Sequence, residues 1–312
     1  MATEGLRDMA SNDKSQNQMN KIRVVVFGST GTGKTSLCNA LTGGKRPTNS
    51  GARGVTTKTH IYPPFFEGDS RIEVIDTAGL HESEHGAVPP EEAVIQIVQL
   101  LESARDGFSL LIHVARAGRV TQHHDEDYQF FVEKMAQGNI PAILVLTGCE
   151  DEEPMSAWVD KNRDAFRRFR YRELIATCFK QGGKNEIDYA PLRMQSREHV
   201  IHAVLAHALA NPVRIYGPGT GSTIDQTLTR LWNEFVTLVR LPDEYRRKVN
   251  ESAYVFLKRL GVPQKIADAA IRHIPDLFEE LGKKVPIPFL GKFLKWVSRS
   301  GLSKILKKRK SQ

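Results

Sequence analysis

The sequence predicts a three-layer α/β domain with a mostly parallel sheet, followed by an α-helical C-terminal extension. Two observations predict this architecture. Short apolar runs alternate with amphipathic stretches between residues 21 and 211, as strands and helices do in doubly wound domains. After the turn signal Gly217-Pro218-Gly219 the strand-like runs stop, and helical patterns continue. The length of 312 residues agrees with more than one structural unit.

The expected strands are short and mostly aliphatic or β-branched, as buried strands of a parallel sheet are. They cover Ile22–Phe27, Ile72–Ile75, Phe108–Val114, Ala142–Leu146 and Leu174–Phe179. The helices expected between them cover Lys34–Leu41, Glu91–Ser103, Glu126–Ala136, Met155–Phe169 and Arg197–Leu209. We therefore expect a disordered polar leader at residues 1–20, an α/β domain at residues 21–211 and a helical extension at residues 212–312.

The composition excludes several classes of protein. Hydrophobic residues make up 40% and charged residues 26% of the chain, which are ordinary values for a protein with a buried core. The three cysteines, Cys38, Cys149 and Cys178, are far apart and odd in number, which excludes a disulfide framework and a cysteine-rich zinc module. They favour a reducing, cytoplasmic compartment. No apolar run is long enough to cross a bilayer.

A glycine-rich segment follows the first expected strand and opens the first expected helix. It reads Gly28-Ser29-Thr30-Gly31-Thr32-Gly33-Lys34-Thr35-Ser36, which contains the GxxxxGK[ST] pattern of phosphate-binding loops. In such a loop, backbone N–H groups turn inward around phosphate oxygens, and the helix N-terminus adds partial positive charge. Lys34 is expected to neutralise the β- and γ-phosphates, and Thr35 to offer its hydroxyl to Mg²⁺. The segment predicts a binding site for a nucleoside triphosphate.

A second motif, Asp76-Thr77-Ala78-Gly79, follows the expected strand Ile72–Ile75. At this place nucleotide hydrolases hold a water on Mg²⁺ through the aspartate and sense the γ-phosphate through the glycine amide. Its position favours a GTPase-like switch over a generic ATPase. Between the two motifs, Thr56, with Thr57 as the rival, is expected to close over the γ-phosphate and the metal. The residues expected at the reacting phosphate are Lys34, Thr56 and Gly79, and those expected at the metal are Thr35, Thr56 and Asp76.

Three segments resemble the immune-associated nucleotide-binding GTPases and the related chloroplast import-receptor GTPases. They are residues 28–43 (GSTGTGKTSLCNALTG), residues 74–80 and residues 110–121. The last is similar to that family's extra segment between the DxxG strand and the base-recognition loop. The resemblance extends over residues 21–150. It implies a septin-related P-loop GTPase fold that binds GTP or GDP with Mg²⁺, often dimerises through its nucleotide face and commonly associates with membranes.

The base-recognition segment departs from that family. Members usually present a Thr-x-x-Asp type sequence to guanine with a lysine or arginine stacked beside the base, whereas this chain reads Thr147-Gly148-Cys149-Glu150-Asp151. A carboxylate has to accept from the two donors on the guanine edge. The expected base-binding residues are therefore Thr147 and Glu150, with Asp151 as the alternative carboxylate. An acidic turn without a ligand is the competing interpretation.

The residue after the second motif is Leu80, which cannot align a water as the glutamine of Ras-like enzymes does. Slow intrinsic hydrolysis is therefore expected, unless His81, a second subunit or a partner supplies the missing group. Arg53, Arg116 and Arg119 are candidates for an arginine that stabilises charge on the transferring phosphoryl group. Ordinary solvated surface positions are the alternative for all three.

Positive charge is concentrated at the C-terminus. The net charge is +8, and residues 281–312 contain ten Lys or Arg and no acidic residue. Within residues 286–310, four apolar residues at i, i+3, i+4 and i+7 share one face of a helix, opposite several basic residues. The four are Leu290, Phe293, Leu294 and Val297. This layout is typical of a helix in an anionic membrane interface. Packing of the apolar face on the helical extension is one alternative, and RNA binding is a less favoured one.

The pair His123-His124, followed by Asp125, is a weak candidate for a metal site. Adjacent residues on a helix face apart, and the sequence nearby offers no further ligands. A solvated helix start is the expected structure at this place.

Together these features predict a GTP-binding protein that hydrolyses GTP slowly to GDP and phosphate. The switch is expected to be coupled to homodimerisation through the nucleotide face and to peripheral attachment at the cytosolic face of a membrane. Two alternatives stay open. One is a nucleotide-binding membrane scaffold with little turnover, and the other is an RNA- or ribosome-associated GTPase that uses the basic tail.

Overall fold

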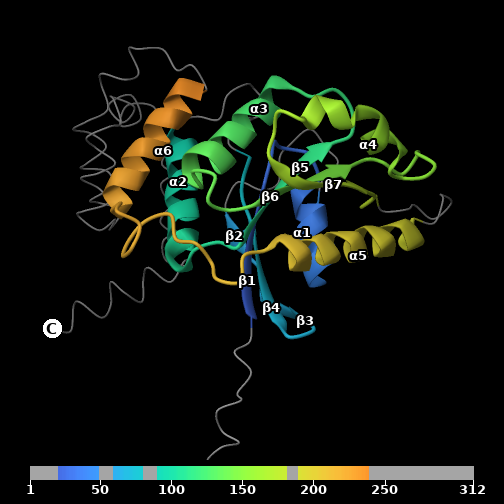
Figure 1. Ribbon diagram of the computed structural model, residues 1–312, viewed down its shortest axis with the longest axis horizontal. Helices are drawn as coiled ribbons and strands as arrows, with labels where there is room; N and C mark the ends of the chain where they lie inside the picture. The colour runs from blue at the N-terminus through green and yellow to red at the C-terminus, as the bar shows by residue number, and fades with distance from the viewer. Residues whose placement is uncertain (1–19, 49–58, 80–89, 181–188, 239–312) are drawn as a thin grey trace, which may run out of the picture.

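The computed structural model describes residues 20–48, 59–79, 90–180 and 189–238. Within these ranges a central sheet is flanked by helices on both faces (Figure 1). Thr56, Thr57, Leu80, His81 and Arg53 lie outside the described residues, as do the leader and the basic tail at residues 286–310. No helix in the described ranges has the length and hydropathy that a bilayer crossing requires.

The described part of the sheet has the strand order β2-β4-β1-β5-β6-β7, with β3 paired to β4 as well. Five strands run parallel: β1 (Asn20–Phe27), β4 (Ser70–Asp76), β5 (Leu110–Arg116), β6 (Ala142–Thr147) and β7 (Tyr171–Thr177). The two short strands β2 (His60–Ile61) and β3 (Phe65–Glu67) are antiparallel to β4. The prediction of a mostly parallel sheet is confirmed.

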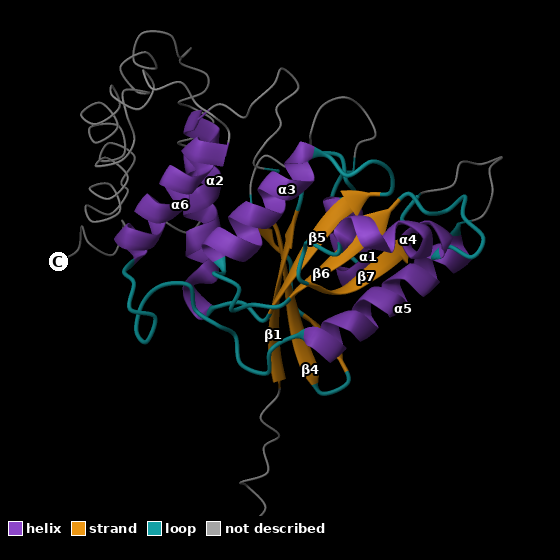
Figure 2. Cartoon of the chain, turned by 45° about the horizontal axis from the view of Figure 1, so that its top comes forward, coloured by secondary structure: helices purple, strands orange, loops and turns teal. Residues whose placement is uncertain are grey.

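The helices are distributed over the two faces of the sheet (Figure 2). They are α1 (Lys34–Thr42), α2 (Pro90–Ser103), α3 (Gln122–Tyr128), α4 (Ala157–Asn162), α5 (Ala190–His207) and α6 (Ile224–Leu238). A π-helix, η2 (Gln129–Met135), continues α3, while the 3-10 helices η1 (Ala104–Asp106) and η3 (Arg163–Phe166) follow α2 and α4. The expected helix Glu126–Ala136 thus starts earlier, at Gln122, and changes from α-helix to π-helix at Gln129. The expected helix Met155–Phe169 is broken into α4 and η3.

Strand β1 explains why the domain has two cores. Val24 and Val26 point to the face covered by α1 and α5, whereas Val25 and Phe27 point to the opposite face, which α2, α3 and η2 cover. All four side chains are buried. A strand covered on both faces reads as a continuous apolar run, because alternate side chains enter different cores.

The final described helix, α6, packs against α2 and η2 (Figure 1). Leu228, Leu231 and Phe235 lie in the same core as β1 and α2, and all three are buried. They recur at helical spacing, so one face of α6 is apolar. Part of the segment after residue 211 is therefore integrated into the hydrophobic core of the α/β domain.

Candidate functional site

The phosphate-loop segment connects the carboxyl end of β1 to the start of α1. Gly28 has φ +136°, and a Cβ there would lie 2.2 Å from the Val114 carbonyl oxygen of β5. Gly33 caps α1 with φ 97°. Both positions require glycine, because a side chain would be strained and at Gly28 would also collide with the neighbouring strand. The glycines let the backbone turn tightly, which leaves the N-terminus of α1 directed at the loop.

The basic side chain of this loop is folded back over it. Lys34 Nζ donates a hydrogen bond to the Ser29 carbonyl oxygen at 2.8 Å, and Thr32 Oγ1 donates to the same oxygen at 2.9 Å. The Lys34 side chain is buried. An ammonium group beside a glycine-rich loop and the N-terminus of a helix is the arrangement that binds a polyphosphate.

Asp76 lies at the end of β4, next to this loop. Thr35 Oγ1 donates to Asp76 Oδ2 at 3.0 Å, and an Arg46 guanidinium nitrogen lies 3.3 Å from the same oxygen. Burial raises the pKa of Asp76, while the Lys34 ammonium, the Thr35 hydrogen bond and Arg46 act in the opposite direction. The other oxygen, Oδ1, is buried and has no hydrogen-bond partner among the described residues.

This orphaned oxygen fits a magnesium site. Mg²⁺ prefers oxygen ligands and usually keeps several waters, so a threonine hydroxyl beside a carboxylate suits it. The buried Oδ1 also needs a partner, since an unsatisfied buried acceptor costs free energy. Thr35 and Asp76 therefore lie together as the sequence predicts, whereas the third expected ligand, Thr56, lies outside the described residues.

Gly79 lies directly against the phosphate loop. A Cβ at this position would be 2.7 Å from Thr30 Oγ1 and 3.0 Å from the Thr30 backbone nitrogen. The end of the second motif thus touches the first, although about fifty residues separate them in the chain. Ser36 follows Thr35 in the first turn of α1 and is half-buried.

The base-recognition segment is tied to the phosphate loop through Thr147, the last residue of β6. Its hydroxyl donates to the Thr32 carbonyl oxygen at 2.7 Å. The Cys149 N–H donates to the Thr177 carbonyl oxygen at 3.3 Å, which joins the loops that follow β6 and β7. Glu150 follows Cys149 directly, so this hydrogen bond brings it near the loop after β7. Burial first, and the charge of Glu150 to a lesser degree, raise the pKa of the Cys178 thiol in that loop.

Sequence reasoning missed Lys180 at this edge of the sheet. Its ammonium group lies 4.9 Å from the centre of the Tyr189 ring and 3.3 Å from the Tyr189 hydroxyl. That contact first, and Glu150 and Asp151 to a smaller extent, raise the pKa of Lys180. The signal that could have identified it is its position directly after the fifth predicted strand.

A buried polar chain begins at the phosphate loop. Ser29 Oγ donates to Asp127 Oδ2 at 2.9 Å, and the same carboxyl oxygen lies 4.0 Å from His113 Nε2. His113 Nδ1 is 2.6 Å from the Tyr171 hydroxyl, which is 3.0 Å from His124 Nε2. Burial raises the pKa of Asp127 to about 7 and lowers the pKa of His124 to about 4. Burial also lowers the pKa of His113 well below its usual value.

The prediction of a solvated helix start at His123-His124 is wrong for His124. This side chain is only 5% exposed, because it stacks on His113 at 4.3 Å between ring centres and meets the ring of Phe169 edge-on at 4.8 Å. His123 remains partly exposed and pairs with Glu126 at 3.1 Å. No group of three or more potential metal ligands occurs among the described residues.

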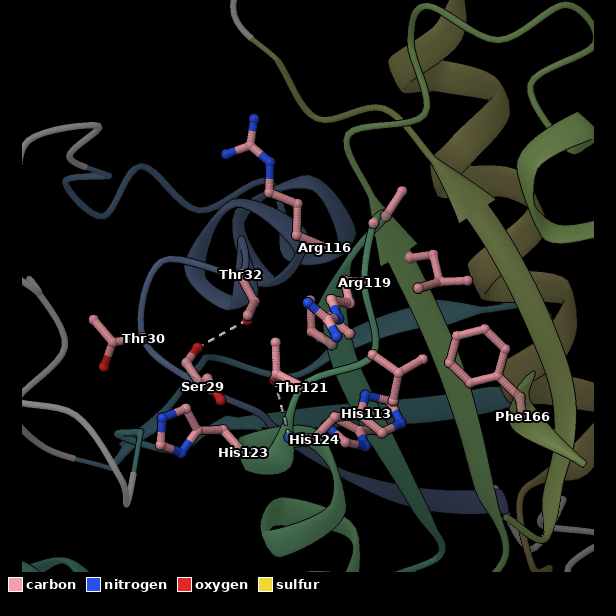
Figure 3. A pocket seen from close by; sticks show the side chains of 16 residues that line it. Ser29, Thr30, Thr32, His113, Arg116, Arg119, Thr121, His123, His124 and Phe166 are labelled. Atoms are coloured by element: carbon pink, nitrogen blue, oxygen red, sulfur yellow. Dashed lines mark hydrogen bonds between the residues drawn. The ribbon is translucent and has the colours of Figure 1, made fainter. Parts of the chain in front are cut away.

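A cavity of about 280 Å³ lies between the phosphate loop and the segment after β5 (Figure 3). Ser29, Thr30 and Thr32 line one side, while the histidines of the polar chain line another. Arg116 and Arg119 contribute side chains from the segment after β5. Both are exposed, and they border the loop that is built for phosphates. Arg53, the third candidate arginine, lies outside the described residues.

The amino-acid sequence is similar to those of known GTPases. Residues 23–148 match the family described as 50S ribosome-binding GTPase. The chain is 25% identical to GTPase Der of Brevibacillus brevis over 226 residues, which is 69% of this chain and 47% of that protein. It thus spans about half the length of this curated relative.

Two solved structures align with part of this chain. One is Era in complex with MgGDPNP and nucleotides of 16S ribosomal RNA, with a TM-score of 0.48 and 17% identity over 62% of this chain and 58% of that chain. The other is Toc33 from Arabidopsis thaliana in complex with GDP and Mg²⁺, with a TM-score of 0.41 and 19% identity over 68% of this chain and 94% of that chain.

Proposed function

We propose that this chain, whose residues 23–148 carry a P-loop GTPase domain, binds GTP with Mg²⁺ and hydrolyses it slowly to GDP and phosphate. The single observation that carries the proposal is the cluster of Lys34, Thr35 and Asp76 around the N-terminus of α1. Lys34 provides charge for the phosphates. Thr35 and Asp76 provide oxygens for the metal, which, when bound, neutralises charge that develops on the phosphoryl group.

Guanine selectivity is assigned to the segment after β6. Thr147 fixes this segment to the phosphate loop, so the base and the phosphates are bound in one register. Glu150, which lies near the loop after β7, is the proposed acceptor for the two donors on the guanine edge. Adenine lacks that pair of donors, so its binding would leave the carboxylate of Glu150 without a partner.

Slow hydrolysis follows from the sequence after Gly79. Leu80 has no group that can orient the attacking water. Faster hydrolysis therefore needs a group from elsewhere, such as an arginine that stabilises the charge on the phosphoryl group. A second copy of the chain, docked on the nucleotide face, is the proposed source. Arg119 is exposed beside the phosphate loop, which is where an arginine can reach a partner's nucleotide.

The test of nucleotide binding is calorimetric titration of the full chain with GTP, GDP and ATP, in the presence and absence of Mg²⁺. Lys34→Ala is expected to weaken GTP binding by about a hundredfold or more, because it removes a charge-assisted contact to phosphate. Arg167→Ala serves as the control, since Arg167 is exposed and forms an ion pair with Asp164 at the surface. Equal affinity of the Lys34→Ala and wild-type chains would refute the proposed site.

The test of the dimer-coupled switch is single-turnover hydrolysis at increasing protein concentration. A rate that rises with concentration supports activation by a second copy. A rate that is low and independent of concentration favours the alternative, a nucleotide-binding scaffold with little turnover.

Attachment to a membrane through residues 286–310 is the remaining part of the proposal. It rests on the concentration of ten basic residues and an apolar helical stripe in the last part of the sequence, which lies outside the described residues. Flotation with anionic liposomes tests it, with a chain ending at residue 285 as the control. Loss of flotation in the shortened chain is the expected result.

An RNA- or ribosome-associated GTPase is the second candidate, and the family description for residues 23–148 favours it. Binding of the full chain to ribosomal RNA and to liposomes across a salt series separates the two candidates. Tail-dependent RNA binding with a steep salt dependence, without liposome binding, would favour the second candidate.

A further inference from the structure

The segment after β6 has a glycine at the position where a stacked cation is expected. Gly148 follows Thr147, and the resemblance described above implies a lysine or arginine beside the base, which this segment does not contain. Gly148 has φ +80° and is exposed. Because Gly148 has no side chain, it leaves space for a neighbouring side chain next to the proposed base site.

Arg116 covers this place. It is the last residue of β5 and pairs in parallel register with Thr147 of β6, so both strands end side by side. The Ala117 N–H donates to the Thr147 carbonyl oxygen at 2.8 Å, which fixes the chain directly after Arg116. A Cβ built at Gly148 would lie 3.5 Å from both Cγ and Nε of Arg116. Arg116 thus occupies the volume next to Gly148 that a larger residue there would contact.

The guanidinium group of Arg116 is free to meet a ligand. The side chain is exposed and makes no hydrogen bond or ion pair with any residue that the structure describes. In Figure 3 it extends away from the histidines at the base of the cavity. Lys180, the other cation near the segment, is instead engaged with the hydroxyl and ring of Tyr189.

We propose that Arg116 binds the purine base of the nucleotide, with its guanidinium plane stacked on the ring, and thereby replaces the cation that Gly148 does not supply. The inference rests on the proposed nucleotide site, and it deepens that proposal by assigning a residue of β5 to the base. A planar guanidinium suits this role, because it stacks on aromatic faces and stays charged at every physiological pH. The absence of a side chain at Gly148 makes room for it.

The assignment distinguishes Arg116 from the other candidate arginines. A residue that contacts the base contributes to affinity for nucleotides in a monomer, and it does not contribute to affinity for a ligand that lacks a base. A residue that acts only on a partner's phosphates changes neither affinity in a monomer. The two roles can therefore be separated by comparing GDP with inorganic pyrophosphate.

The experiment is displacement of a fluorescent GDP from the full chain by GDP and by pyrophosphate, each with Mg²⁺, at protein concentrations at which the chain is monomeric. The variants are Arg116→Ala and Arg116→Lys, with Lys180→Ala as the competing cation and Arg167→Ala as the surface control. Thermal unfolding of each variant confirms that it is folded.

Arg116→Ala is expected to weaken GDP binding about tenfold and to leave pyrophosphate binding unchanged, in line with a desolvated cation–π contact. Arg116→Lys is expected to retain part of the GDP affinity. Unchanged GDP affinity in Arg116→Ala, an equal loss for GDP and pyrophosphate, or a base-dependent loss in Lys180→Ala alone would overturn the assignment. Failure of the wild-type chain to bind either ligand would instead refute the nucleotide site itself.

Discussion

Replacing Asp127 by asparagine tests the buried polar chain behind the phosphate loop. Asp127 is fully buried, and its carboxyl oxygen accepts a hydrogen bond from Ser29 Oγ at 2.9 Å. Desolvation raises the pKa of this carboxyl from 3.8 to about 7, against the opposing effects of the Ser29 hydrogen bond and the charges of Lys34 and His123. Asparagine keeps an acceptor for Ser29 and carries no charge.

The sign of the effect follows from the direction of that shift. Because the pKa is higher in the folded protein, the folded state holds the proton more tightly than the unfolded state does. The contribution of Asp127 to the free energy of unfolding is greatest below pH 3.8. It falls as the pH rises from 3.8 to about 7, and it is constant above about pH 7. At 1.36 kcal/mol per pH unit, the loss between pH 5 and pH 8 is about 3 kcal/mol.

The assay is urea unfolding of the wild-type chain and of Asp127→Asn at pH 5 and pH 8. The variant is expected to gain about 3 kcal/mol relative to the wild type between these two pH values. Burial lowers the pKa values of His113 and His124, so these two residues lower the free energy of unfolding as the pH falls. Both proteins contain them, so their effect cancels in the comparison.

Asp125→Asn is the matched control for this experiment. It removes a carboxylate from the same helix, at a surface pair with Arg168, and is expected to change stability by less than about 1 kcal/mol at both pH values. If the stabilities of Asp127→Asn and the wild type run parallel from pH 5 to pH 8, Asp127 ionises without cost, and the reasoning is wrong.

Three further predictions concern the site itself. Gly28→Ala is expected to lower the free energy of unfolding by more than about 2 kcal/mol, since its Cβ would lie 2.2 Å from the Val114 carbonyl oxygen; denaturant titration measures this. Mg²⁺ is expected to raise the GTP affinity of Asp76→Asn by a factor at least ten times smaller than that for the wild-type chain, and calorimetry with and without the ion measures this. Thr147→Val removes the 2.7 Å hydrogen bond to the Thr32 carbonyl and is expected to weaken GDP binding about fivefold, with unchanged affinity contradicting a role for this bond.

Strands β1 and β6 could be predicted from the sequence because each contains a continuous apolar run. Val24, Val25 and Val26 are all fully buried, so no polar residue interrupts the pattern. The two antiparallel strands β2 and β3 were not predicted, because a strand of two or three residues is too short to show an alternating pattern. Their existence depends on pairing with β4, which is information about distant residues.

The site was only partly predictable for the same reason. Lys34 and Thr35 are recognisable because a local motif fixes both their identity and their surroundings. The environment of His124 depends on Phe169 and Tyr171, which follow more than forty positions later and whose approach no local pattern encodes. The change to π-helical winding at Gln129 is likewise invisible in a periodicity that differs little from that of an α-helix.

The burial of α6 has a practical consequence for anyone who wants to shorten this protein. Leu228, Leu231 and Phe235 pack into the core beside α2 and η2, and Arg230 of the same helix donates a hydrogen bond to the Lys134 carbonyl oxygen. A fragment that ends at residue 211 lacks α6, so the apolar residues of α2 and η2 that α6 covers would be exposed to solvent. Such a fragment would be prone to aggregate during purification. A minimal nucleotide-binding fragment therefore has to include α6 as far as Leu238.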